Sequence, residues 1–143
     1  EYAWLSRFDA FGLRIELPRG FSVLAQRLDG DTAVGPSADG RGSGIVEFWA
    51  DYLMASKAFG RQRVSVRYDR MYVETVRGAA FYDDWQDGHA WTLAWFFDFN
   101  DSWQIVAEGL RNDSKLRQRR LAGLPPAAVE DELQLAVRYS FRP

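Results

Sequence analysis

The stretch FGLRIELP, residues 11–18, alternates apolar residues with polar residues or glycine. A period of two places all its large apolar side chains on one side of an extended chain, which predicts a half-buried β-strand. Pro18 and Gly20 then mark a turn, and residues 21–28 are expected to form the returning strand. This opening predicts an antiparallel sheet.

The middle of the chain continues the pattern with interruptions. Residues 29–44 are rich in Gly, Asp and Ser, which predicts a long surface loop. Residues 45–59 begin with strand-like alternation, whereas their second half would also suit a short helix. Residues 62–76 alternate again and predict a further strand.

Two turn signals divide residues 78–110 into three expected antiparallel strands. Asp87-Gly88 is a hairpin-turn dipeptide because Gly readily adopts a positive φ, and residues 99–103 contain the second signal. The strand between these turns has one strongly apolar face, which carries Trp91, Leu93, Trp95 and Phe97. We expect this face to contribute to the core.

The end of the chain predicts helices. Asn112 or Asp113 would cap a short helix that stops at Gly123, and Pro125 or Pro126 suits the first turn of a second helix. The second helix would direct one apolar stripe at the sheet, made of Val129, Leu133, Ala136 and Val137. The expected fold class is therefore α+β, an antiparallel β-sheet with packed helices, including a C-terminal helix.

Composition limits the domain count and the chemistry. The 143 residues suit one domain, residues 1–143. The net charge of −2 gives no general attraction for nucleic acid, although residues 111–120 form a basic patch. We expect that patch to be a solvated helix face, with phosphate or an acidic partner as alternative contacts. The absence of Cys excludes disulfides, thiol nucleophiles and cysteine-ligated metal.

Reactive groups are scarce. The chain has one histidine, His89, and no serine in a nucleophile-elbow motif. Asp83 and Asp84 are adjacent, so on a strand they would face opposite ways, which argues against a paired acid and base. We therefore predict that the protein is not an enzyme, with no catalytic residue, no metal ligand and no cofactor.

The stretch FYDDWQDGHAW, residues 81–91, is the strongest candidate for a binding surface because aromatic and acidic side chains meet at a predicted hairpin tip. The candidate partner-binding residues are Tyr82, Asp83, Asp84, Trp85, Asp87 and His89. Three alternatives stay open: Trp85 folds back over its own hairpin, His89 is a solvated turn residue, or the acids hold calcium.

The order of elements resembles a known family. An opening strand FGLRIELPRGF, a central VRGAAFYDDWQDGHAWTLAWFF and a last segment AVRYSFRP follow one another as in photosystem extrinsic protein P, whose fold is shared with a Ran-binding nuclear import factor. The pattern is more similar to bacterial immunity lipoproteins that protect a cell against toxins delivered by type VI secretion. The resemblance covers most of the chain and implies a PsbP-like α/β/α-type sandwich. No functional residue is carried over by motif.

The resemblance implies a periplasmic protein that binds a secreted toxin enzyme and occludes its active-site cleft. A peptidoglycan-degrading muramidase is the first expected target and a phospholipase the second, with calcium as an optional bridge at the interface. Such proteins have a signal peptide and often a lipid anchor, and an opening at Glu1 would fit removal of that segment. The alternatives are a non-catalytic accessory subunit of a cell-envelope complex and a weak hydrolase that uses scattered carboxylates.

Overall fold

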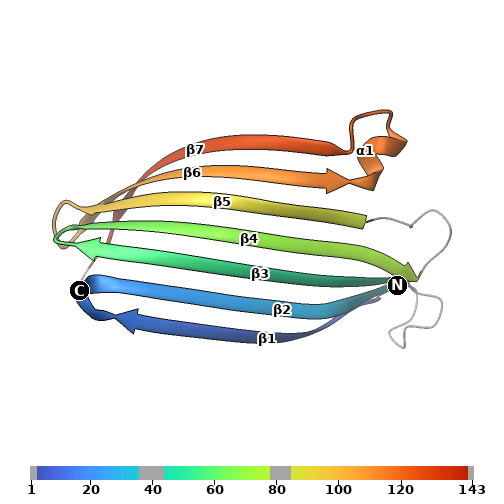
Figure 1. Cartoon of the computed structure of the whole chain (residues 1–143), viewed down its shortest axis with the longest axis horizontal. Helices are drawn as coiled ribbons and strands as arrows, with labels where there is room; N and C mark the ends of the chain where they lie inside the picture. Colours follow the sequence, from blue (N-terminus) through green and yellow to red (C-terminus); the bar gives the residue numbers. More distant parts are fainter. Residues whose placement is uncertain (1–2, 36–43, 78–84, 142–143) are drawn as a thin grey trace.

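The computed structural model describes residues 3–35, 44–77 and 85–141, which form one seven-stranded antiparallel sheet (Figure 1). Each strand pairs with the strands before and after it in sequence, so the order in the sheet is β1 to β7. The elements are β1 (Ala3–Leu17), the 3-10 turn η1 (Pro18–Gly20), β2 (Phe21–Gly35), β3 (Gly44–Phe59), β4 (Gln62–Arg77), β5 (Trp85–Asp98), β6 (Trp103–Leu116), α1 (Arg117–Leu121) and β7 (Ala127–Tyr139).

Short turns join the strands at one end of the sheet. Arg19 and Gly20 adopt positive φ values of 64° and 76° between β1 and β2, and Gly60 does so at 59° between β3 and β4. Between β5 and β6, the side-chain oxygen of Asn100 accepts hydrogen bonds from the backbone N–H groups of Ser102 and Trp103, at 2.9 and 3.0 Å. The helix α1 lies at the opposite end of the sheet (Figure 1).

Strand register divides the side chains into two faces of the sheet. The face that carries Leu93 is called the Leu93 face, and the opposite face, which carries Thr92, is called the Thr92 face. Across β4, β5 and β6, Leu93 aligns with Val66 and Gly109, whereas Thr92 aligns with Arg67 and Leu110. The two faces keep this identity across all seven strands.

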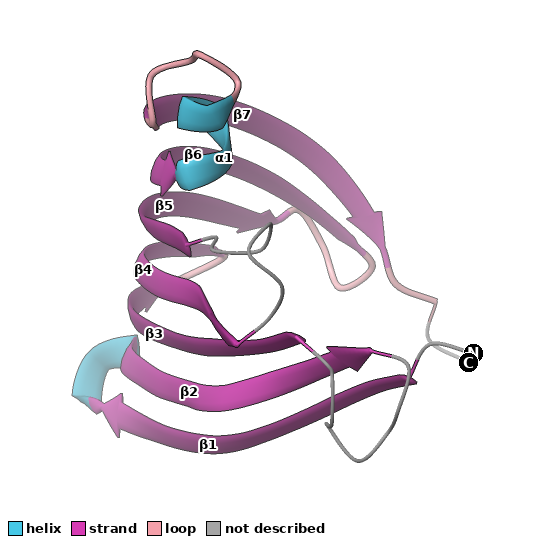
Figure 2. Cartoon of the chain, turned by 90° about the vertical axis from the view of Figure 1, so that its right-hand side faces the viewer, coloured by secondary structure: helices cyan, strands magenta, loops and turns pink. Residues whose placement is uncertain are grey.

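The sheet is strongly curved (Figure 2). Every buried side chain in the described residues, such as Thr92 and Ala94, belongs to the Thr92 face, whereas even the small side chain of Ala55 on the Leu93 face is exposed. This difference places the Thr92 face on the inside of the curve. The only buried hydrophobic residues in the described part are Ala94 and Val106, so this sheet encloses almost no core of its own.

The predicted α+β fold with packed helices, including the PsbP-like sandwich, is wrong. The only α-helix in the described segments is α1, with five residues, and the expected C-terminal helix is strand β7. Leu133, Leu135, Val137 and Tyr139 alternate with polar or small residues, so the same residues satisfy a period of two as well as a helical stripe. Pairing with β6 along its whole length selects the strand.

Two predicted connections are also wrong in detail. Asp87-Gly88 lies inside β5 and not in a turn, because β4 and β6 pair with both residues. The expected loop 29–44 is shorter, since β2 continues to Gly35. The predicted opening strand, its turn at Pro18–Gly20 and its return are confirmed.

Candidate functional site

The structure moves the predicted partner-binding residues from a hairpin tip to the side of a strand. Tyr82, Asp83 and Asp84 lie outside the described residues. Trp85, Asp87 and His89 occupy alternate positions of β5, so all three belong to the Leu93 face. They are brought together on one surface, but on a regular strand and not at a protruding tip.

His89 belongs to a small ion-pair network on that face. Its Nε2 atom lies 3.5 Å from a carboxylate oxygen of Asp113, and the same oxygen lies 3.9 Å from Nε of Arg111. Arg111 also reaches Asp131 on β7, at 3.8 Å. The ring of Tyr68 lies 6.0 Å from the His89 ring. These long, solvent-exposed contacts fix no proton donor and acceptor geometry of the kind a catalytic pair requires.

Aromatic and charged side chains continue this surface toward β3. The rings of Trp49 and Tyr72 are stacked 6.2 Å apart, and the guanidinium of Arg70 lies 5.2 Å from the Trp49 ring. The Tyr72 hydroxyl donates a 2.9 Å hydrogen bond to Glu74. That hydrogen bond, followed by desolvation and the negative charges of Glu74 and Asp87, raises the pKa of Tyr72 above its usual value.

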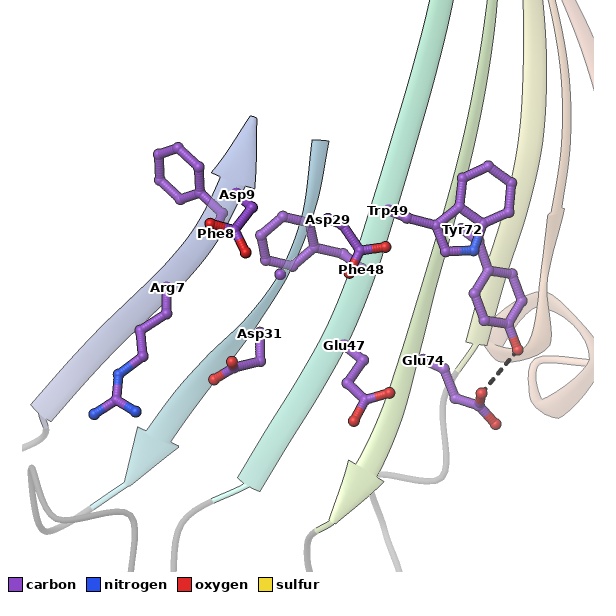
Figure 3. Close-up of a pocket in the computed structure, with 11 residues that line it drawn as sticks. Arg7, Phe8, Asp9, Asp29, Asp31, Glu47, Phe48, Trp49, Tyr72 and Glu74 are labelled. Carbon is purple, nitrogen blue, oxygen red and sulfur yellow. Dashed lines mark hydrogen bonds between the residues drawn. The ribbon is translucent and has the colours of Figure 1, made fainter. Parts of the chain in front are cut away.

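A hollow of about 660 Å³ opens beside this aromatic pair (Figure 3). Its charged lining residues are Arg7, Asp9, Asp29, Asp31, Glu47 and Glu74. Within residues 3–35, 44–77 and 85–141, no group of three or more His, Asp or Glu residues could hold a metal ion.

We call the charged part of the Leu93 face the charged rim. It occupies the half of the sheet nearest α1 and comprises Arg7, Asp9, Arg27, Asp29, Asp31, Glu47, Asp51, Arg70, Glu74, Asp87, His89, Arg111, Asp113, Lys115 and Asp131.

The other half of the Leu93 face is an apolar belt that crosses all seven strands. The belt comprises Phe11, Leu13, Ile15, Leu17, Phe21, Val23, Ala25, Leu53, Ala55, Phe59, Val64, Val66, Tyr68, Trp91, Leu93, Trp95, Phe97, Trp103, Ile105, Ala107, Leu133, Leu135, Val137 and Tyr139. The row through Leu93 is apolar or Gly from β1 to β7, and the next row toward the short turns is interrupted only by Lys57.

Most of the belt is exposed and none of it is buried, which overturns the expectation that its β5 residues form a core. Leu93 is 56% exposed and Leu133 is 85% exposed. Isolated exposed apolar residues are normal, but a contiguous patch of this extent marks an interaction surface. The sequence signal was present in the alternation of every strand. The same alternation is typical of strands that bury one face in a two-layer fold, so it does not by itself predict exposure.

The boundary between belt and charged rim runs obliquely across the strands. On β1 the belt begins at Phe11, which aligns through the register with His89 of the charged rim on β5. On β7 it begins at Leu133, which aligns with Leu93. The boundary therefore shifts by four residues, about 13 Å at ~3.3 Å per residue, across the sheet. Strands that cross a straight apolar band at an angle produce an oblique boundary of this kind.

The Thr92 face mixes polar side chains with apolar ones, such as Leu24, Phe48 and Leu110. Hydroxyl pairs join its strands, with Ser56 to Ser65 at 2.7 Å and Ser6 to Thr32 at 2.9 Å. Arg67 donates a 2.8 Å hydrogen bond to Asp69 on the same face.

In the part of the chain that the structure describes, no helix has the length and hydropathy needed to cross a membrane. No protein-family model, curated protein or solved structure matches the chain. The function is therefore inferred from the two faces of the sheet alone.

Proposed function

We propose that this sheet is embedded in a lipid bilayer, with the apolar belt against the acyl chains and the charged rim among the headgroups. The observation that carries the proposal is the continuous, exposed belt across all seven strands. Each large apolar side chain transferred from water to hydrocarbon contributes roughly 1.5–3 kcal/mol. If the belt stayed in water, this stabilisation would be lost for every large apolar side chain in it.

The dimensions of the belt suit a bilayer. It extends from Trp91 to Phe97 on β5, about 20 Å at ~3.3 Å per residue. On β7 it extends from Leu133 to Tyr139, which is also about 20 Å. The apolar band of strand-spanned membrane proteins is about 25 Å tall, and its strands need about 9–11 residues.

Amphipathic side chains occur at both borders of the belt. Tyr68 and Trp91 lie next to the charged rim, with their rings 4.8 Å apart. Trp103 and Tyr139 lie at the border nearest the short turns, with their rings 4.7 Å apart. Lys57 lies one same-face position inside that border on β3, and its amine points toward the backbone oxygen of Arg19. Trp, Tyr and Lys prefer such interfacial positions because they combine an apolar body with a polar tip.

A second protein layer explains the belt less well than lipid does. A second sheet packed on the belt would cover only part of its width. The belt, however, reaches both edge strands, with Ile15 exposed on β1 and Leu135 exposed on β7. It also lies on the outside of the curve, where side chains spread apart. Fluid acyl chains cover a curved surface without shape complementarity.

The proposal places a requirement on the edges of the sheet. In hydrocarbon, each backbone N–H and C=O group must be hydrogen-bonded within protein. The outer sides of β1 and β7 have no strand partner in the described residues. We therefore expect partner strands along both edges when the sheet is in the bilayer.

The sequence-based prediction of a toxin-neutralising periplasmic protein stays a prediction, as does the alternative of an accessory envelope subunit. The PsbP-like fold on which the resemblance relied is wrong, and Trp85, Asp87 and His89 lie in the charged rim. Toxin binding through that rim would be compatible with a membrane-embedded belt, because the rim would remain in contact with water.

The test uses the tryptophans already in the belt. The full chain is reconstituted into phosphatidylcholine vesicles whose acyl chains carry bromine, which quenches indole fluorescence on contact. We expect strong quenching that is largely lost when Trp91, Trp95 and Trp103 are replaced together by Phe, because the three remaining tryptophans, Trp4, Trp49 and Trp85, belong to the charged half of the sheet. A chain that fails to float with the vesicles, or equal quenching in the triple variant, would overturn the proposal.

A further inference from the structure

The two outer edges of the sheet expose backbone groups that no strand satisfies in the described residues. On β7, the N–H of Ser140 donates a 2.8 Å hydrogen bond to the carbonyl oxygen of Ser102, and the carbonyl oxygen of Pro126 accepts one of 3.0 Å from Leu116. Even-numbered residues of β7 therefore direct their backbone groups at β6. The regular register makes the odd-numbered residues, such as Leu135, direct theirs outward. In hydrocarbon, where no water can replace a partner, these groups need a neighbouring strand.

Neither edge has the features by which sheets usually block a further strand. Those features are proline, lysine, a β-bulge or a very short edge strand. β1 and β7 contain no Pro or Lys, and they have 15 and 13 residues. Both pair with their inner neighbours without a register shift. The two edges are therefore open to the addition of a strand from another chain.

The two edge strands match each other in direction and in pattern. Because each strand is antiparallel to the next, β1 and β7 both run from the charged rim toward the short turns. Each carries four alternate belt residues, in Phe11–Leu17 on β1 and in Leu133–Tyr139 on β7. When the first residues of these segments lie side by side, the belt continues from β7 of one copy to β1 of another. A shift of two residues either way would place Asp9 or Asp131 against the partner's belt.

The charges of the Thr92 face favour the same register. Arg138 on β7 forms no ion pair with any acid in the segments that the structure describes. In this register it lies beside Glu16 of the other copy. Glu16 accepts a 2.7 Å hydrogen bond from Arg14 of its own strand, and its side chain is still 59% exposed. Opposite charges at neighbouring positions of adjacent strands stabilise their pairing, so Arg138 gains a partner in Glu16.

We propose that β7 of one copy pairs in parallel with β1 of a second copy, so that copies join head to tail and both edges gain a partner. The inference rests on the proposed membrane location, because the edges require a partner strand there. Both charged rims then lie at the same bilayer surface, and the curve of the sheet allows the copies to close into a ring (Figure 2). Parallel pairs are slightly less stable than antiparallel ones. Antiparallel pairing of β7 with a second β7, however, would insert the two copies in opposite directions and leave β1 unpaired.

The absence of Cys from the sequence allows a direct test of this contact. In the proposed register, Val137 of one copy lies beside Ile15 of the next. Chains with Val137→Cys, which carry a size tag, are mixed with untagged Ile15→Cys chains, reconstituted into vesicles and oxidised with a membrane-permeable copper reagent. Neighbouring strands are about 4.8 Å apart, which is within the Cα spacing of a disulfide.

We expect a disulfide-linked dimer of one tagged and one untagged chain. Its yield should be at least about tenfold higher than with Leu13→Cys in place of Ile15→Cys, because Leu13 lies one same-face position away and beyond disulfide reach. Neither the Val137→Cys chain nor the Ile15→Cys chain should cross-link when reconstituted alone.

Charge reversal tests the register on the Thr92 face. Arg138→Glu in the Val137→Cys chain should reduce the yield of the mixed dimer about threefold, because it opposes Glu16 with a like charge. Glu16→Arg in the Ile15→Cys chain should do the same. When the two reversed chains are mixed with each other, most of the yield should return, since opposite charges again lie side by side. A merely structural effect of either substitution would not be reversed by the other.

Two results would overturn the inference. One is a mixed dimer that is no more abundant with Ile15→Cys than with Leu13→Cys. The other is cross-linking of Val137→Cys chains with one another at the same yield, which would indicate pairing of β7 with itself. Quenching by brominated acyl chains is measured in the same vesicles. If quenching persists without the mixed dimer, the sheet is in the bilayer but a second copy is not its edge partner, whereas loss of quenching contradicts the membrane location itself.

Discussion

The two faces of the sheet are formed by alternate residues of the same strands, yet their side chains differ in exposure to solvent. Leu93 is 56% exposed on one face, and the next residue, Ala94, is 5% exposed on the other. The inner face combines small and hydroxyl-bearing residues with larger apolar ones, such as Val106 and Leu110, which the curve partly or fully buries. The outer face uses large apolar residues that no protein in the described structure covers. The exposed apolar residues therefore indicate an apolar environment around the outer face and not a defect in packing.

The largest expected effect comes from placing a charge in the apolar belt. Leu93→Arg should lower the free energy of unfolding of the bilayer-embedded chain by about 2–4 kcal/mol, since it puts an arginine near the middle of the hydrocarbon. Urea unfolding in vesicles, followed by tryptophan fluorescence, would measure the change.

The matched control is His89→Arg, four residues away in the charged rim, where the effect should be within about 0.5 kcal/mol. If Leu93→Arg left the free energy of unfolding unchanged, water would surround the belt. The lipid bilayer would then not explain why the two faces differ.

Two glycines compare the crowding of the faces. A Cβ on Gly30, on the inner Thr92 face, would lie 2.3 Å from the backbone oxygen of Arg7, whereas a Cβ on Gly109, on the Leu93 face, would meet nothing within 4 Å. Gly30→Ala should therefore cost about 1–3 kcal/mol through overpacking. Gly109→Ala should be neutral or slightly stabilising. Equal effects in the same unfolding assay would contradict the assignment of the inner face.

The sequence predicted the individual strands better than their assembly. The alternation in residues 11–17 and in Trp91–Phe97 is local, because a period of two follows from the extended backbone, and both strands are confirmed. The helix prediction failed at Leu133 and Val137, where one set of positions fits two periods and only pairing with β6 decides between them.

The site was less predictable than the strands. Asp87-Gly88 resembles a hairpin turn, but Gly88 lies within a strand where a larger residue would be tight. A Cβ there would lie 3.3 Å from the backbone oxygen of Asp113 on the neighbouring strand. Recognition of the belt required the register of all seven strands, since no single strand shows that its apolar face continues on the next. The charged rim is likewise assembled from residues that are far apart in sequence.

A smaller effect is expected from the buried hydroxyl pair of the inner face. Ser56 and Ser65 are 7% and 8% exposed and lie 2.7 Å apart. Ser65→Ala should cost about 1–2 kcal/mol because it leaves the Ser56 hydroxyl without its partner. The double variant with Ser56→Ala should recover most of that loss, since no unpaired hydroxyl remains. If the loss of unfolding free energy in the double variant equalled the sum of the two single losses, water would be replacing the missing partner in each single variant.

The smallest expected effect tests whether the charged rim contacts water. The hydrogen bond from Tyr72 to Glu74 raises the pKa of Tyr72, so Glu74→Gln should lower it toward the usual value. NMR of chains with ¹³C-labelled tyrosine would follow the titration, with Tyr72→Phe to assign the signal. Because the folded-state pKa is raised, its stabilising contribution is complete below the unfolded pKa, about 10. It is lost as pH rises through the folded value, and this loss should be weaker in Glu74→Gln. A Tyr72 that does not titrate in vesicles up to the pH at which the sheet unfolds would place the rim in hydrocarbon, and the boundary between the two halves of the Leu93 face would be wrong.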